Sequence, residues 1–299
     1  MTKSAFIAIV GCPNVGKSSL LNAFVGKKVA IVSDKPHTTR TRIMGVVTRG
    51  ETQLVFLDTP GVLKPHSRLG DFMAKSIEEA MSGVDAALMV VEPTPEIRVP
   101  EEDLLGKLKA AELPTVLAIN KVDAVEEKTD LLACLAAWKD RHGFDDLYPV
   151  SAHTGDGLDG LLDKLSEYAF ESPHFFPADA TSDQPESALA GELVREQMLR
   201  LLRQEVPHGV AVMVEPLVER ENRDGAVVLD VEATILCERE NHKGIIIGKK
   251  GAMLKQISTG ARLQMESLFG AKVNLQCWVK VKEDWRDRQS ILNQLGYRI

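Results

Sequence analysis

The sequence has few cysteines, few aromatic residues and no long uninterrupted apolar run. Its four cysteines are far apart in 299 residues and form no C-x-x-C pair, which argues against a disulfide framework or a zinc site. No stretch approaches the roughly 18 apolar residues of a membrane-spanning helix, and the run at residues 5–10 is too short for a signal peptide. We therefore expect a cytoplasmic protein with free thiols.

The chain also lacks the overall positive charge that is common in nucleic-acid-binding proteins. It carries 36 basic and 43 acidic residues, a net charge of −7. Residues 239–299, however, hold 12 Lys and Arg against 5 Asp and Glu, a net of +7, so the rest of the chain carries −14. A basic end on an acidic body points to nucleic acid or to a membrane surface.

Short apolar runs alternate with amphipathic stretches in the first half of the chain. This alternation predicts an α/β domain with a mostly parallel sheet. One hairpin is expected where residues 42–49 and 53–57 meet across Gly50 and Glu51. The expected strands are 5–10, 54–57, 86–91, 115–119 and 147–150, and the expected helices are 18–25, 101–111, 130–141 and 158–170.

The second half has a different organisation. Residues 171–187 contain three prolines among Ser, Asp, Thr and Gln, which is typical of a linker. The patterns that follow predict the order α-β-β-α-α-β, an α+β domain. We expect a first domain over 1–170, a linker over 171–190 and a second domain over 191–299. The elements expected in the second domain are helix 189–206, strands 210–218 and 226–237, a short glycine-bounded element, helix 252–269 and strand 272–281.

Residues 11–18 read GCPNVGKS and fit the phosphate-binding motif G-x-x-x-x-G-K-[ST] between a strand and a helix. The glycines allow a tight turn whose N–H groups surround phosphates, and the helix N-terminus adds positive potential. Lys17 is expected to reach the β- and γ-phosphates and Ser18 to hold Mg²⁺. The nucleotide-binding residues predicted here are Gly11, Cys12, Pro13, Asn14, Val15, Gly16, Lys17, Ser18 and Ser19.

A second set of residues indicates guanine specificity. Asn120, Lys121, Val122 and Asp123 read NKVD and follow the apolar run 115–119 directly. The Asp123 carboxylate can accept hydrogen bonds from both N1–H and the exocyclic amine of guanine, a donor pair that adenine lacks. The Lys121 stem can lie over the base plane. Ser151 and Ala152, after another strand, are expected to place backbone groups beside the guanine O6.

Two further segments predict a response to the γ-phosphate. Asp58, Thr59, Pro60, Gly61 and Val62 follow another strand; Asp58 is expected to hold Mg²⁺ through a water, and the Gly61 N–H to meet the γ-phosphate. A threonine of the segment PHTTRTR at 36–42 would bind Mg²⁺ in the GTP state. Thr39 is preferred over Thr38, and the choice stays open.

These motifs resemble translation-factor-class GTPases over residues 1–170, and within them the branch of Era and the tRNA-modifying GTPases. In Ras-like proteins a Gln orients the attacking water, but Val62 occupies that place here. Asn14 matches a phosphate-loop Asn that binds potassium in similar GTPases. Either potassium or a partner surface would then assist hydrolysis, and we expect slow intrinsic turnover. The catalytic candidates are Lys17, Thr39, Gly61 and Asn14.

The second domain contains a G-x-x-G loop, GKKG, at 248–251. In KH domains such a loop clamps the backbone of about four nucleotides. The predicted RNA-binding residues are Ile246, Ile247, Gly248, Lys249, Lys250, Gly251 and Lys255. Trp278 and Trp285 are candidates for stacking on RNA bases, but Trp278 alternates within a strand and is expected in the core. The basic segment around Trp285 either extends the RNA surface or is a solvated helix face.

A GTPase domain, a linker and a type II KH domain together resemble the Era family over the whole chain. The resemblance implies binding to the 3′ end of 16S ribosomal RNA, a role in small (30S) subunit assembly, peripheral contact with the inner membrane and a monomer. Three alternatives stay open: a tRNA-modification factor, a membrane-surface GTPase whose basic end binds anionic lipid, and a protein in which GTP is only a structural ligand. Lys17, Ser18 and Asp58 argue against the last.

Overall fold

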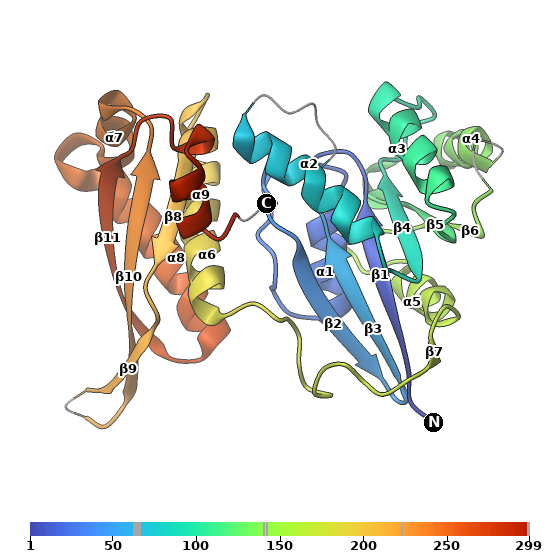
Figure 1. Ribbon diagram of the computed structural model, residues 1–299, viewed down its shortest axis with the longest axis horizontal. Helices are drawn as coiled ribbons and strands as arrows, with labels where there is room; N and C mark the ends of the chain where they lie inside the picture. Colours follow the sequence, from blue (N-terminus) through green and yellow to red (C-terminus); the bar gives the residue numbers. More distant parts are fainter. Residues whose placement is uncertain (62–66, 140, 142, 223, 298–299) are drawn as a thin grey trace. The chain divides into compact units, whose positions relative to one another are not determined.

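The computed structural model describes residues 1–61, 67–139, 141, 143–222 and 224–297. The chain forms two compact units that are not continuous in sequence. The first unit holds residues 1–30, 39–65 and 73–183; the second holds 31–38, 66–72 and 184–299. Figure 1 shows the elements of both units.

The first unit is built on a mostly parallel sheet, as the sequence predicts. The strand order is β2-β3-β1-β4-β5-β6; β7 pairs antiparallel with β1, and β2 pairs antiparallel with β3 in the expected hairpin. Its strands are β1 Lys3–Val10, β2 Ile43–Arg49, β3 Thr52–Asp58, β4 Ala86–Val91, β5 Thr115–Ile119, β6 Asp146–Pro149 and β7 Phe170–Glu171. Its helices are α1 Lys17–Val25, α3 Val99–Ala110, α4 Lys128–Lys139 and α5 Leu158–Ser166, with the short η1 Val122–Ala124. The sequence reasoning did not predict α2 Arg68–Met81, which starts in the second unit and continues in the first.

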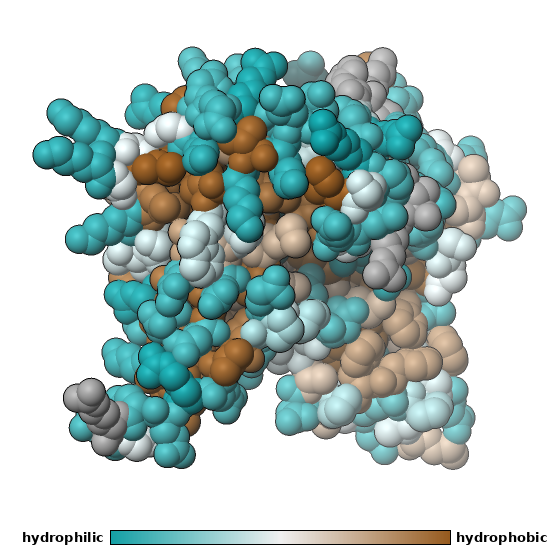
Figure 2. Space-filling view, turned by 60° about the vertical axis from the view of Figure 1, so that its left-hand side comes forward, coloured by the Kyte–Doolittle hydropathy of each residue, from teal (hydrophilic) through white to brown (hydrophobic). Residues whose placement is uncertain are grey.

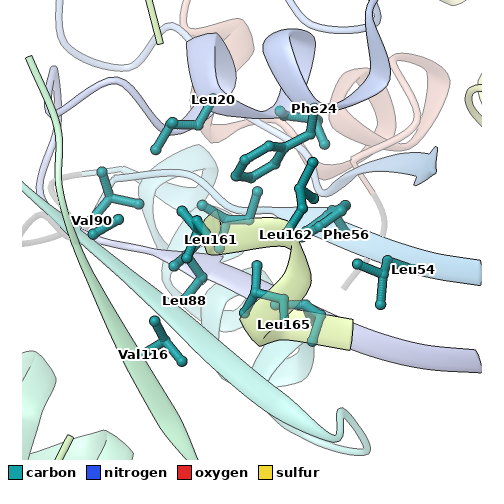
Figure 3. Packing of buried hydrophobic residues seen from close by; sticks show 14 of the residues in the cluster. Leu20, Phe24, Leu54, Phe56, Leu88, Val90, Val116, Leu161, Leu162 and Leu165 are labelled. Carbon is teal, nitrogen blue, oxygen red and sulfur yellow. The ribbon is translucent and has the colours of Figure 1, made fainter. Parts of the chain in front are cut away.

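The sheet is buried on both faces, which explains why its strands read as apolar runs. Side chains from α1, α5 and the strands β3, β4 and β5 form a core on one face (Figure 3). Phe24 of α1 stacks on Phe56 of β3 with 5.0 Å between ring centroids. The other face packs against α3 and α4, with Trp138 fully buried.

The expected linker is held against the first unit by hydrogen bonds. The Gln53 side chain accepts from the N–H groups of Phe175 and Phe176 at 2.9 and 3.0 Å. The Val46 N–H donates to the Thr181 carbonyl at 3.0 Å. These contacts involve side chains and edge groups of β2 and β3, so proline content alone did not reveal them.

The second unit has the predicted order α-β-β-α-α-β with additions. Its sheet order is β11-β10-β8, with β10 and β11 parallel, and β9 pairs antiparallel with β10. The strands are β8 Val210–Val214, β9 Val218–Glu221, β10 Val227–Cys237 and β11 Lys272–Val281. The helices are α6 Glu186–Leu201, α7 Glu240–Ile247, α8 Ala252–Phe269 and α9 Gln289–Gln294, with η2 Val206–Gly209, η3 Lys249–Gly251 and η4 Trp285–Asp287.

One expected strand, 210–218, is divided in two. β8 ends at Val214, and β9 begins at Val218 after Glu215 and Pro216. Proline has no N–H to donate to a sheet, so the strand is interrupted there and resumes beside the first half of β10. The helices α6 and α8 cover one face of the sheet with a shared apolar core. Along β11 exposed residues alternate with more buried ones, the pattern of a sheet packed on one face.

Candidate nucleotide-binding site

The loop after β1 requires glycine at two positions. Gly11 and Gly16 have φ of 154° and 97°, values that side-chain-bearing residues rarely adopt. A Cβ on Gly11 would lie 2.4 Å from the Val90 carbonyl oxygen, and one on Gly16 would lie 2.2 Å from Nδ2 of Asn120. The glycines therefore permit both the turn and the close approach of neighbouring strand ends.

Lys17, the first residue of α1, lies inside this loop. Its side chain is 6 % exposed, and its Nζ donates to the carbonyls of Gly11 and Cys12 at 3.0 and 2.9 Å. Burial lowers the pKa of Lys17, and the nearby Asp58 carboxylate opposes that shift. The loop thus holds a cation at the N-terminal end of a helix, which is a site for phosphate.

Three side-chain oxygens meet beside Lys17. The Ser18 hydroxyl donates to Oδ2 of Asp58 at 2.5 Å and lies 2.9 Å from Oγ1 of Thr39. Oγ1 of Thr39 lies 3.4 Å from the same Oδ2 of Asp58. Oδ1 of Asp58 is buried without a hydrogen-bond partner. Hydroxyl and carboxylate oxygens with an unsatisfied buried acceptor fit a hard cation such as Mg²⁺.

The structure distinguishes the two threonine candidates. Thr39 belongs to the first unit with Ser18 and Asp58, whereas Thr38 belongs to the second unit. The Thr38 hydroxyl donates instead to the Lys35 carbonyl at 2.6 Å. Thr39 is therefore the threonine whose oxygen joins the cluster.

Burial also shifts the proton affinity of the carboxylate in this cluster. Desolvation raises the pKa of Asp58, while Lys17 and the hydroxyls of Ser18 and Thr39 lower it. The charged form consequently depends on these partners. The oxygens of Ser18, Thr39 and Asp58 are the candidate cation ligands, because they lie within 2.5 to 3.4 Å of one another. Among the described residues no group of three or more His, Cys, Asp and Glu side chains forms a metal-binding cluster.

Asn120 joins two loops. Its Nδ2 donates to the Val15 carbonyl at 2.9 Å, and its Oδ1 accepts from the Ala152 N–H at 3.0 Å. The side chain is 1 % exposed. The sequence grouped Asn120 with the base-binding residues, but its amide connects the phosphate-binding loop to the loop after β6. The Ala152 N–H expected beside guanine O6 is bonded to Asn120 in this structure.

Asp123 is exposed and oriented by a neighbouring loop. Its Oδ1 accepts from the Ser151 hydroxyl at 2.6 Å. The Ser151 oxygen in turn accepts from the N–H groups of His153 and Thr154 at 3.2 and 3.0 Å. Ser151 therefore contributes its side chain and not only its backbone, because it fixes the direction of the carboxylate.

The segment after β3 lies against the phosphate-binding loop. The Thr59 hydroxyl donates to the Ile9 carbonyl at 2.9 Å, which ties this segment to β1. A Cβ on Gly61 would lie 2.8 Å from the backbone of Pro13, so the close approach requires glycine. Val62, on which the argument about hydrolysis depends, lies outside the described residues.

Sequence reasoning missed Glu92, which directly follows β4. Its Oε1 accepts from the Lys121 ammonium at 2.5 Å, and that ammonium also donates to the Asn14 carbonyl at 2.6 Å. An acidic residue directly after a buried apolar strand was the available signal, because the carboxyl ends of parallel strands meet at one edge of the sheet.

In the second unit the GKKG loop has the backbone that its glycines predict. Gly248 and Gly251 have φ of 72° and 79°, and a Cβ on Gly248 would lie 2.6 Å from that of Met253. Lys249, Lys250 and the nearby Lys255 are exposed. The loop therefore presents three cations beside backbone that a ligand can approach closely.

Three sequence expectations for this unit need correction. Ile246 is fully buried in the core of α6, α8 and the sheet, so its side chain packs there instead of facing RNA. Trp278, expected in the core, is 43 % exposed because its position on β11 points away from the helices. Trp285 is fully buried, and its Nε1 donates to the Gly209 carbonyl at 2.9 Å, so it cannot stack on a base.

Figure 2 shows hydrophobic residues in small groups on a largely hydrophilic surface.

Residues 31–38, which follow the phosphate-loop helix in sequence, belong to the second unit. Ile31 is part of its core, and the Val32 N–H donates to Oε1 of the buried Glu196 at 3.0 Å. The Arg195 guanidinium, 1 % exposed, donates to the Thr38 carbonyl. Buried charged side chains of α6 thus hold both ends of this segment.

The comparisons with known proteins agree with this arrangement. A family model described as "50S ribosome-binding GTPase" matches residues 6–121, and a KH-domain model matches residues 205–286. The chain is 46 % identical to GTPase Era of Clostridioides difficile over 298 residues, covering 99 % of each chain. It is also 46 % identical to GTPase Era of Caldicellulosiruptor saccharolyticus, over 99 % of this chain and 98 % of the relative.

Two solved structures match the whole chain at 36 % identity and cover 100 % of both chains. One is a variant of Era from Aquifex aeolicus bound to GDP and AlF4−, with a TM-score of 0.93. The other is Era in complex with MgGDPNP and nucleotides 1506–1542 of 16S ribosomal RNA, with a TM-score of 0.94. The 46 % identity over nearly the whole chain, the GTPase-model match in the first unit and the KH-domain match in the second show that the chain belongs to the GTPase Era family.

Proposed function

We propose that this protein is a GTP-hydrolysing switch that binds 16S ribosomal RNA near its 3′ end through the KH domain and assists assembly of the small ribosomal subunit. The observation that carries the proposal is the presence of both sites in one chain. The oxygens of Ser18, Thr39 and Asp58 surround a cation position beside Lys17, and GKKG forms an exposed loop in a KH fold. A related protein has been solved with that RNA and MgGDPNP.

Crosslinking followed by sequencing of the bound RNA tests this function. Enrichment of the 3′ end of 16S RNA is the expected result. Enrichment of tRNA would instead support a tRNA-modification factor, and absence of RNA would support a GTPase that binds anionic lipid. A tRNA-modification factor needs further catalytic groups, such as a reactive cysteine. Cys277 lies within β11, and burial raises the pKa of its thiol to about 11, which disfavours the reactive thiolate.

Mg²⁺ is the cofactor that the oxygen cluster fits. Ser18 and Thr39 would bind it directly and Asp58 through a water; in support of a shared ion, the three oxygens lie 2.5 to 3.4 Å apart. The ion would neutralise charge on the β- and γ-phosphates. Lys17 would add a second positive charge there, and the Gly61 N–H would contact the γ-phosphate.

Base recognition would rest on a further set of groups. Asp123, held by Ser151, would accept from guanine, and the Lys121 stem would cover the base. Asn120 would support both by joining their loops. The remaining proposed nucleotide contacts come from the backbone of 11–19, 58–62, 122 and 151–152.

Hydrolysis would use either potassium bound at Asn14 or a group that a partner surface supplies, with slow intrinsic turnover in both cases. Asn14 has φ of 67° and is exposed, and its carbonyl accepts from Lys121. This left-handed backbone at a loop tip presents the residue outward, as a ligand to a monovalent cation beside phosphates would need. Equal GTP hydrolysis rates in potassium and in sodium would contradict this role.

RNA binding would use the backbone of Gly248 and Gly251 and the cations of Lys249, Lys250 and Lys255, with Ile247 at the groove. Replacing Lys249 and Lys250 together by alanine is expected to lower RNA affinity and to reduce the slope of log affinity against log salt by about 1.4. The matched control replaces the exposed Lys107 and Lys109 of α3 by alanine. An unchanged slope in the GKKG variant would contradict the assignment.

We further propose that nucleotide state alters how the KH domain is held. GTP would order residues 35–41 and 62–70, of which 62–66 lie outside the described residues. In support, residues 31–38 are bonded to Glu196 and Arg195 of α6, while Thr39, the next residue, contacts Ser18. RNA affinity should therefore differ between the GDP and GDPNP states; equal affinities would contradict the coupling.

The domain division and the cellular setting are also proposals. We place the GTPase domain at 1–170, the linker at 171–190 and the KH domain at 191–299, supported by the change of compact unit between 183 and 184. We propose a monomer in the cytoplasm with peripheral contact with the inner membrane, an inference from the family resemblance. Among the described residues no helix is long and apolar enough to cross a membrane. Sedimentation and membrane fractionation test these points.

A further inference from the structure

Glu92 lies at the nucleotide site but outside its sequence motifs. It follows β4, and its Oε1 accepts a hydrogen bond of 2.5 Å from Nζ of Lys121. The same ammonium donates to the Asn14 carbonyl at 2.6 Å. Lys121 therefore connects the end of β4 to the phosphate-binding loop.

Lys121 is a residue whose position needs support. Its backbone is left-handed, with φ of 65°, a conformation that costs free energy in residues with side chains. Its side chain is 41 % exposed, and a long flexible lysine has many rotamers to lose on being fixed. Two acceptors on different loops hold the ammonium in one place and thereby fix the direction of the stem.

Glu92 is held in turn by Arg98, whose guanidinium is bonded to the buried Glu101. Its Oε2 lies 3.8 Å from Nη1 of Arg98. Nε and Nη2 of Arg98 donate to Oε1 of Glu101 at 3.1 and 2.5 Å, and the Arg98 N–H donates to Oε2 of Glu101 at 2.8 Å. Glu101 is 1 % exposed and belongs to the first turn of α3.

This connection separates the pair from an ordinary surface salt bridge. An isolated exposed pair contributes little, because two long side chains must be ordered for it. Here Glu92 is 33 % exposed and lies next to Arg98, whose guanidinium is fixed by Glu101. The Glu92 side chain therefore loses less conformational entropy when it binds Lys121. The network runs from α3 to the loop that carries Asn14.

We propose that Glu92 is a positioning residue for guanine nucleotide: it holds the Lys121 ammonium against the phosphate-binding loop, so that the Lys121 stem covers the base and slows nucleotide release. The inference rests on the proposed binding of guanine nucleotide at this site. It predicts an effect on dissociation more than on association, because the contact acts after the nucleotide has entered.

The test compares Glu92→Gln with wild type in the full-length protein. Glutamine keeps the size of the side chain but removes the negative charge. We expect dissociation of a fluorescent GDP analogue in Mg²⁺ to become about five- to tenfold faster, because a hydrogen bond between two charged groups is replaced by a weaker one to a neutral acceptor. Glu96→Gln is the matched control, because Glu96 is exposed in the same loop; its rate should stay within about twofold of wild type.

A second comparison separates positioning from a general structural role. In a Lys121→Met background, Glu92→Gln should leave the dissociation rate unchanged, because the group it acts through is gone. An unchanged rate for Glu92→Gln alone, or the same acceleration in the Lys121→Met background, would overturn the proposal. Binding of the analogue by wild type tests the proposed function separately, and a wild-type chain that does not bind it would overturn both.

Discussion

The side-chain amide of Asn120 donates a hydrogen bond to the Val15 carbonyl across 2.9 Å, in a space that Gly16 leaves open. This contact joins the end of β5 to the phosphate-binding loop. It makes the NKVD segment and the phosphate-binding loop parts of one structure within the first unit.

Replacing Asn120 by aspartate should weaken GDP binding by about tenfold or more. A carboxylate cannot donate to the Val15 carbonyl, and it would be buried as an uncompensated charge at a site that is 1 % exposed. Titration calorimetry with GDP measures the change, and Asn120→Ser, which keeps a donor, should lose less. Affinity equal to that of wild type would show that the contact is dispensable.

Replacing Asp123 by asparagine should exchange guanine for xanthine specificity. The proposed role of the carboxylate, oriented by Ser151, is to accept from two guanine donors, whereas an asparagine amide would present one donor that suits the C2 carbonyl of xanthine. We expect kcat/KM for GTP to fall by about 100-fold or more and that for XTP to rise. If GTP remained the better substrate, Asp123 would not be the group that reads the base.

Thr39→Ala and Thr38→Ala should have different effects on the Mg²⁺ requirement. Oγ1 of Thr39 lies 2.9 Å from the Ser18 hydroxyl oxygen, whereas the Thr38 hydroxyl donates a hydrogen bond to the Lys35 carbonyl. Thr39→Ala should raise the Mg²⁺ concentration for half-maximal GTP hydrolysis about tenfold. Thr38→Ala serves as the control. The reverse order of effects would transfer the role to Thr38.

The two tryptophans of the second unit should differ in their contribution to stability. Trp285 is fully buried and its Nε1 bonds the Gly209 carbonyl, so Trp285→Ala should lower the free energy of unfolding by about 3–5 kcal/mol. Trp278 is 43 % exposed, and Trp278→Ala should cost about 1 kcal/mol or less. Urea unfolding followed by circular dichroism measures both. Similar losses would mean that Trp278 is covered in solution.

Two cysteines should be nearly inert at neutral pH. Burial raises the pKa of the Cys134 and Cys277 thiols to about 11 each. Because the thiolate is the nucleophile, alkylation at pH 8 should be roughly 100-fold slower than for a free thiol, and should quicken as pH approaches 11. Mass spectrometry after iodoacetamide treatment measures each site, and fast labelling in the native protein at pH 8 would contradict this.

The same shifts predict the direction of alkaline destabilisation. The folded state keeps these protons more tightly than the unfolded state, so the contribution of the thiols to stability is present below the unfolded pKa of 9.0 and is lost as pH rises toward 11. Thermal melts between pH 8 and pH 11 should therefore show falling midpoints. A melting midpoint that stays constant across this range would contradict the shift.

The sequence by itself determined the two-part organisation and the kinds of site. GCPNVGKS, DTPG, NKVD and GKKG are contiguous segments, and their chemistry depends on backbone turns and strand ends that local sequence specifies. Parallel strands appear as buried apolar runs, so their carboxyl ends, and hence the place of the motifs, were predictable.

Only the tertiary structure decided which distant side chains meet. It selected Thr39 over Thr38, placed Ile246 in the core, and brought Glu92 to Lys121. It also placed residues 31–38 with α6 in the second unit. These outcomes depend on packing between segments 21 to more than 150 residues apart, where periodicity and motif spacing carry no information.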